Sequence, residues 1–279
     1  MRPGAVFYKM SGSGNDFAVF DGRYNRLEEF TTERIRAVCD RRQGVGADGV
    51  ILLEPTVRED VHFVFHYWNS DGSEGPMCGN GALCATRLAG LIALAPEGGE
   101  VRFATAAGVH RGMARGMRPE IRLPDCAAPV SLPAARTEPE ERLPTLARPS
   151  VPHLVLVVDD VAAVNLERRG PPLRHDPAIG AGGANVNWVA ALGDGSFRMR
   201  TYERGVEAET LACGTGAVAC ALALEKNGLA GPGVRLWTSS RLPLDVKWRR
   251  DGDRITSLSL QGEGRLVYKG VLGEPPTSA

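Results

Sequence analysis

Two cysteines of this sequence, Cys78 and Cys213, have the setting that acid–base chemistry requires. Each is followed by Gly-x-Gly, as Cys78-Gly79-Asn80-Gly81 and Cys213-Gly214-Thr215-Gly216. An Ala- and Leu-rich run comes next in both places, at residues 82–94 and 217–227, and such runs favour helix. The pattern therefore predicts one cysteine at the N-terminus of each of two helices.

A helix N-terminus presents unsatisfied N–H groups and a partial positive charge. That charge favours a thiolate over a thiol. The same amides can bind a carboxylate and stabilise the negative charge that develops when an α-proton is removed. Inversion of a stereocentre needs one group to remove a proton and another to return one on the opposite face. We therefore predict a racemase or epimerase of an amino acid that uses Cys78 and Cys213 as this pair, with no cofactor and no metal.

The sequence around the two cysteines is repeated. Residues 67–82 align with residues 202–217 without a gap, and a Tyr, a Glu, the Cys, two Gly and an Ala coincide. A weaker echo joins residues 46–52 to residues 183–189. The alignment predicts two homologous halves.

The expected boundaries follow from this repeat. Residues 1–130 form an N-terminal half that carries Cys78, and residues 131–265 form a C-terminal half that carries Cys213. Residues 266–279 are expected to return to the N-terminal half, with a frayed tail from Gly273 onward. The Pro- and charge-rich residues 132–149 are interpreted as the linker between the halves.

Strand-like runs surround the two predicted helices. They are rich in aromatic and β-branched residues and lie at residues 50–53, 62–68, 154–158, 185–190 and 197–202. The helices are apolar nearly all round, which indicates burial on every side. We expect an α/β (α+β) fold of two pseudo-symmetric halves. Each half is a mixed β-sheet wrapped around a central buried helix.

Composition and charge exclude several classes of partner. Lys plus Arg and Asp plus Glu both number 33, so no nucleic acid and no anionic membrane surface is expected as a partner. No secretory signal or membrane span is evident, which predicts a cytoplasmic protein whose six cysteines are free thiols. The spacings Cys-x2-Cys and His-Glu-x2-His, which are typical of metal sites, do not occur.

Several of these motifs resemble those of the diaminopimelate epimerase family, and the resemblance runs nearly from end to end. The opening loop is similar at residues 9–17 (KMSGSGNDF), and the glycine-rich strand entry at residues 44–49 (GVGADG). The first cysteine block is NSDGSE at residues 69–74 followed by CGNGA at residues 78–82. The second is ERG at residues 203–205 followed by ETLACGTG at residues 209–216.

The resemblance implies an active site in the cleft between two halves, an activity and a set of site residues. The family interconverts LL- and meso-diaminopimelate on the lysine and cell-wall pathway, and its members are often homodimers. The implied substrate pocket is lined by Asn15, Asn69, Asn185, Glu203 and Arg204. Backbone amides of Gly79-Asn80 and Gly214-Thr215 would bind the α-carboxylate, and His153 and Glu203 would tune the thiols or orient the substrate.

Two departures from the family pattern leave the substrate open. Val151-Pro152-His153 stands where the family has Asn-Pro-His, and Leu83 stands where it has an arginine. The alternatives are a racemase of another amino acid, such as histidine, with the same mechanism, and a non-catalytic amino-acid-binding paralogue. The other four cysteines are interpreted as packing residues.

Overall fold

The computed structural model describes residues 1–274. Its contacts divide the chain into two compact units, Met1–Ile121 with the segment from Gly262 onward, and Arg122–Gln261. The first boundary therefore lies before the expected 130/131, because residues 126–131 form strands that pair within the second unit. The second boundary lies before the expected residue 265. Of the tail expected to fray, residues 275–279 lie outside the described part of the chain.

The first unit is built on one mixed sheet. Its spatial order is β19-β1-β2-β3-β4-β6-β7-β8, and the short β5 also pairs with β4. The pairs β2–β3 and β4–β6 are parallel, and the others are antiparallel. The strands are β1 (Val6–Gly12), β2 (Asn15–Asp21), β3 (Gly49–Pro55), β4 (Phe63–Asn69), β5 (Glu74–Gly75), β6 (Glu100–Thr105), β7 (Gly108–Met113), β8 (Glu120–Arg122) and β19 (Arg265–Val271).

The second unit repeats this plan. Its order is β10-β11-β12-β13-β14-β16-β17-β18-β9, with β15 also on β14, and the parallel pairs are β12–β13 and β14–β16. The parallel pairs thus fall at equivalent places in both sheets. The strands are β9 (Cys126–Ala127), β10 (Val130–Ser131), β11 (Arg142–Ala147), β12 (His153–Val157), β13 (Asn185–Ala191), β14 (Phe197–Glu203), β15 (Ala208–Thr210), β16 (Gly233–Trp237), β17 (Pro243–Asp251) and β18 (Arg254–Gln261).

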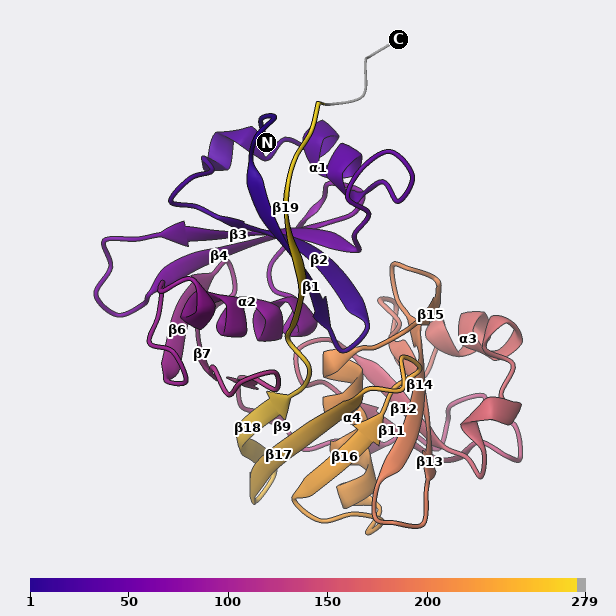
Figure 1. Ribbon diagram of the computed structural model, residues 1–279. Coiled ribbons are helices and arrows are strands. Elements are labelled where there is room, and N and C mark those ends of the chain that lie inside the picture. The colour runs from indigo at the N-terminus through magenta and orange to yellow at the C-terminus, as the bar shows by residue number, and fades with distance from the viewer. Residues whose placement is uncertain (275–279) are drawn as a thin grey trace. The chain divides into compact units, whose positions relative to one another are not determined.

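In the first unit the sheet is covered by helices on both faces (Figure 1). Helix α2 (Gly79–Leu91) packs against β1, β2, β3, β6, β7 and β19, and α1 (Thr32–Cys39) packs on β3 from the other side. Phe20, Val50 and Leu52 join Ile35 of α1 in one core cluster. Because side chains alternate along a strand, the intervening Ile51 faces α2. This double coverage explains why the central strands are apolar without alternation.

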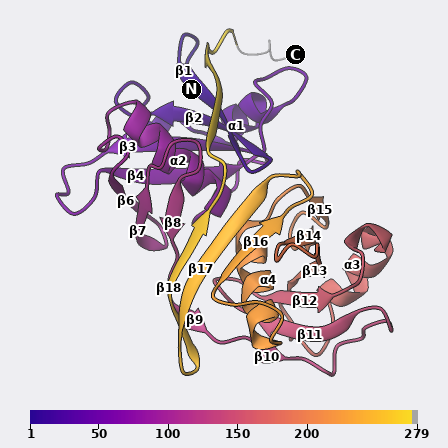
Figure 2. The ribbon, with the colours of Figure 1, turned by 60° about the horizontal axis from the view of Figure 1, so that its bottom comes forward.

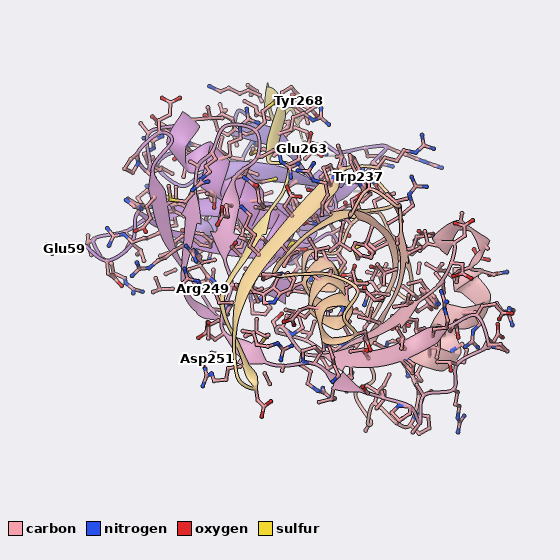
Figure 3. All side chains as sticks on the ribbon, turned by 90° about the horizontal axis from the view of Figure 1, so that it is seen from below. Glu59, Trp237, Arg249, Asp251, Glu263 and Tyr268 are labelled. Atoms are coloured by element: carbon pink, nitrogen blue, oxygen red, sulfur yellow. The ribbon has the colours of Figure 1, made fainter. Side chains whose placement is uncertain are left out.

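The second unit has the same two layers of helix. Helix α4 (Gly214–Lys226) packs against β11–β14, β16 and β17, and α3 (Leu166–Arg174) packs against β13–β15. Figures 1 and 2 show α3 and α4 on opposite faces of these strands. In Figure 3 the curved strands enclose α4, with Trp237 and Arg249 marking β16 and β17. Residues 217–224 of α4 are all buried, as its lack of a polar face predicts.

The prediction of a linker at residues 132–149 was wrong. These residues include β11, which pairs with both β10 and β12. A charged residue of this segment, Glu141, is buried in the interior of the unit. It accepts hydrogen bonds from Arg169 and another from Trp188 Nε1 at 3.0 Å. Because some charged residues of this segment form a buried ion pair, its composition resembles that of an exposed linker although it is part of the folded unit.

Short helices η1 (Leu27–Glu29) and η2 (Val161–Ala163) complete the described elements. Over residues 1–274, no helix combines the length and apolarity needed to cross a membrane.

Candidate active site

Cys78 is the N-cap residue of α2. Its backbone is extended, with φ −126° and ψ 121°, and its Sγ accepts a hydrogen bond from the Gly81 N–H at 3.5 Å. The helix begins at Gly79, so the sulfur lies at the positive end of the helix dipole. A Cβ added to Gly81 would lie 3.0 Å from Ile51 Cδ1, a tight contact with the tip of a flexible side chain.

Cys213 caps α4 in the same way. Its φ and ψ are −128° and 110°, and the Gly216 N–H donates to its Sγ at 3.3 Å. The Thr215 hydroxyl also lies 3.6 Å from this sulfur. Hydrogen-bond donors and a helix N-terminus both stabilise a thiolate relative to a thiol. The two caps therefore match in backbone geometry and in the donor three residues on.

Asn15 and Asn80 meet at the start of α2. The Asn80 amide donates to Asn15 Oδ1 at 2.6 Å, and the Asn15 amide donates to Asp48 Oδ2 at 3.1 Å. Arg41 pairs with both Asp48 and Asp16. Burial raises the pKa of Asp16, but the hydrogen bonds and charges of Arg41 and Lys9 outweigh it and lower that pKa to about 2. A charged network thus fixes Asn15 beside the first turn of the helix.

Asn69 stands at the end of β4, in the hairpin before Cys78. Its Oδ1 accepts from the Tyr67 hydroxyl at 2.7 Å, and its Nδ2 donates to Ser73 Oγ at 3.0 Å. These hydrogen bonds lie within the hairpin, and the side chain is exposed. The orientation of the Asn69 side chain is therefore set by residues of its own hairpin.

His153 is fully buried at the start of β12, next to α4. Its Nε2 is 3.0 Å from Thr215 Oγ1, and its Nδ1 is 3.1 Å from Asn187 Nδ2. Burial is the main reason that the pKa of His153 is lowered to about 3, and the charge of Arg204 acts in the same direction. The imidazole is therefore neutral at physiological pH.

Asn185, Glu203 and Arg204 lie together where β13 and β14 meet. Asn185 Oδ1 accepts the Arg204 backbone N–H at 2.7 Å, and its Nδ2 lies 3.3 Å from His153 Nε2. Glu203 Oε2 accepts from the Thr210 hydroxyl at 2.8 Å. Within the second unit, these contacts connect Asn185 and the Arg204 backbone to His153 and, through Thr215, to Cys213.

The prediction of site residues missed four polar side chains that support the site. They are Arg41 and Asp48 behind Asn15, and Asn187 and Thr201 behind His153. Asn187 carried a usable signal, because a fully buried asparagine in an otherwise apolar strand must find hydrogen-bond partners.

The other cysteines have a different environment. Cys84 and Cys220 are wholly buried inside α2 and α4, and burial raises the pKa of both thiols. Burial raises the pKa of Cys39 to about 12 and also raises that of Cys126. Leu83, the departure in the first block, is wholly buried as well. No group of His, Cys, Asp and Glu within residues 1–274 is arranged to hold a metal ion.

Each unit thus presents a cysteine at a helix N-terminus, together with backbone amides that can bind a carboxylate. These features are typical of an enzyme that uses thiols as acid and base. The family model for diaminopimelate epimerase matches residues 7–111 and 146–258. The chain belongs to the diaminopimelate epimerase family.

Relatives of the chain extend over nearly its whole length. A diaminopimelate epimerase of Gemmatimonas aurantiaca is 42% identical, covering 95% of this chain and 98% of that protein. One from Aquifex aeolicus is 38% identical, covering 96% and 98%. A solved structure of a PhzF-family phenazine biosynthesis protein from Bacillus anthracis has a TM-score of 0.72 at 12% identity, covering 98% of this chain and 99% of that one, and it shares the mixed α/β fold.

Proposed function

We propose that this protein epimerises LL-diaminopimelate to meso-diaminopimelate without a cofactor. The observation that carries the proposal is the pair of matching caps, in which Cys78 and Cys213 each begin a buried helix and accept an N–H from the third residue on. The named activity of the full-length relatives supplies the substrate.

In the proposed reaction, one cysteine as a thiolate removes the α-proton. The electron pair left on carbon delocalises into the α-carboxylate, whose charge the amides of Gly79-Asn80 and Gly214-Thr215 stabilise. The other cysteine, as a thiol, delivers its proton to the opposite face and becomes the thiolate. The proposal requires that one substrate molecule reaches both cysteines, as in the active-site cleft between two halves that the family resemblance implies.

Substrate binding is assigned to Asn15, Asn69, Asn185, Glu203 and Arg204. Support comes from within each unit. Asn15 is fixed beside the first turn of α2, and Asn185 is held by the Arg204 backbone. His153 and Glu203 are assigned to tuning a thiol or orienting the substrate, and His153 contacts Thr215, which in turn contacts Cys213.

The departure at Val151 makes substrate identity the point to test. Purified protein would be incubated in deuterated water with LL- and meso-diaminopimelate, L-histidine and L-lysine, each followed by mass spectrometry and chiral chromatography. We expect α-deuterium and inversion with both diaminopimelate stereoisomers. Inversion of another amino acid and none of diaminopimelate would replace the proposed substrate, and no exchange in any of them would favour a binding protein.

We also propose that the protein is a homodimer, on the strength of its family. Light scattering coupled to size-exclusion chromatography measures the mass directly. A mass near the 29.8 kDa of a single chain at micromolar concentration would contradict this proposal.

A further inference from the structure

A chain of hydrogen bonds runs beneath Cys213 inside the second unit. It joins Thr201, Asn187, His153 and Thr215 in sequence and ends at Cys213 Sγ. Asn187, His153 and Thr201 are buried, and Asn187 lies on β13 two residues after Asn185. Neither the repeat nor the family motifs pointed to Asn187.

The orientation of the Asn187 amide is fixed by its partners. Its Nδ2 lies 3.2 Å from the Leu154 carbonyl, which can only accept, and its Oδ1 lies 2.9 Å from the Thr201 hydroxyl. The second hydrogen of Nδ2 therefore points at His153 Nδ1, 3.1 Å away. It follows that Nδ1 of His153 is an acceptor.

A neutral imidazole carries one proton, so an accepting Nδ1 places that proton on Nε2. Nε2 then donates to Thr215 Oγ1 at 3.0 Å. Asn185 Nδ2 also lies 3.3 Å from Nε2, which favours the opposite tautomer. The contact with Asn187 decides between them, because it is the shorter and because both ends of that amide are held.

With its lone pair engaged by His153, the Thr215 hydroxyl directs its hydrogen toward Cys213 Sγ, 3.6 Å away. The sulfur then faces two donors, Thr215 O–H and the Gly216 N–H. The first unit differs at the equivalent places. Ile51 stands against Gly81 as Asn187 stands against Gly216, and Asn80 directs its amide to Asn15.

We propose that Asn187 is a positioning residue for Cys213, which acts by fixing the tautomer of His153 so that Thr215 donates to the sulfur. A donor to the sulfur stabilises the thiolate, so the relay favours the thiolate form of Cys213. The charge of Arg204, which acts on His153, disfavours the imidazolium and so supports the neutral ring. The inference rests on the proposed role of Cys213, but its test needs no turnover.

The test uses the full chain labelled with ¹⁵N-histidine and ¹³Cβ-cysteine. Nitrogen shifts report the tautomer of His153, and carbon shifts against pH give the titration midpoints of Cys213 and Cys78. In the unsubstituted protein we expect Nε2–H at His153. Asn187→Asp replaces the donor by an acceptor of the same shape. It should move the proton to Nδ1 and raise the Cys213 midpoint by about one pH unit.

A second pair of variants keeps the test decisive if Asn187→Asp does not fold. Thr215→Val removes the hydroxyl and should raise the Cys213 midpoint by about one pH unit, and Thr215→Ser should restore it. The matched control is Thr145→Val, which removes the hydroxyl of another buried threonine of the second unit, one that donates to the Leu143 carbonyl. This substitution should change neither midpoint. Nδ1–H in the unsubstituted protein, or a Cys213 midpoint unmoved by Thr215→Val, overturns the inference. Either outcome leaves the proposed reaction intact.

Discussion

At the scale of single residues, Cys78 and Cys213 differ from the other cysteines in what surrounds the sulfur. Each accepts a backbone N–H at the start of a helix. Burial raises the pKa of the remaining four, Cys39, Cys84, Cys126 and Cys220, and keeps them protonated. The proposed catalytic thiols therefore differ from the packing thiols in their place at the N-terminus of a helix.

Replacing either proposed catalytic thiol should abolish inversion while its neighbour tolerates the same change. We expect Cys78→Ala or Cys213→Ala to lower kcat for epimerisation by about 10²–10⁴, the usual contribution of a general acid or base. Cys84→Ala and Cys220→Ala, one turn or two further along α2 and α4, are the matched controls and should keep most of the activity. Coupled assays of product formation give kcat, and equal losses in all four variants would contradict the assignment.

Buried His153 should make the protein sensitive to acid. Its folded-state pKa of about 3 lies below the ordinary 6.5, so the unfolded chain gains a proton first as the pH falls. The contribution of the neutral His153 ring to the free energy of unfolding is fully present above pH 6.5 and is lost progressively as the pH falls to about 3. This loss amounts to at most about 1.4 kcal/mol per pH unit.

Urea unfolding at a series of pH values would measure this effect. His153→Gln lacks the titrating ring, so its free energy of unfolding should fall less steeply on acidification than that of the unsubstituted protein. Parallel pH profiles for the two proteins would show that His153 is not held neutral in the fold.

At the scale of elements, the sequence predicted the helices after the two cysteines and the central strands well. Ala- and Leu-rich composition without a polar face identified the buried runs of α2 and α4, and these helices begin at Gly79 and Gly214, before the predicted Ala-rich runs. Composition misled at residues 132–149, where a buried charge pair stabilises the fold around β11. The support behind His153 could not be predicted, because it depends on which strands become neighbours.

The two helix starts should differ in their tolerance of alanine. A Cβ on Gly216 would lie 2.6 Å from Asn187 Oδ1, which is held at both ends, whereas on Gly81 it would lie 3.0 Å from the flexible tip of Ile51. We expect Gly216→Ala to cost about 1–3 kcal/mol of unfolding free energy and Gly81→Ala less. Gly231→Ala, with open space around it, is the control. Denaturant melts decide this, and a larger loss for Gly81→Ala would contradict it.

At the scale of the whole molecule, the chain builds the same strand order twice and then returns to its start. After β18 ends the second unit, β19 pairs with β1 of the first and places Tyr268 against Phe7 at 5.9 Å. The repeat in the sequence predicted two halves. It could not give the boundaries, because strand pairing between distant segments decides where each unit ends.

Removal of β19 should loosen only the first unit. A chain ending at Gly264 loses the whole ladder to β1, and we expect amide hydrogen exchange in β1 to rise at least about tenfold. Strand β11, which keeps both of its neighbours in the second unit, is the internal control. Equal acceleration in β1 and β11 would show that the units do not respond separately.

The central claim, two thiols acting on opposite faces of one carbon, is tested most directly by early deuterium incorporation. LL-diaminopimelate would be converted in deuterated water, and the isotope content of product and of remaining substrate would be measured before a tenth or so of it has reacted. Two bases predict product that carries α-deuterium from the first turnover, and remaining substrate that carries almost none. Deuterium appearing in the remaining substrate as fast as in the product would mean that one base serves both faces, and it would contradict the account.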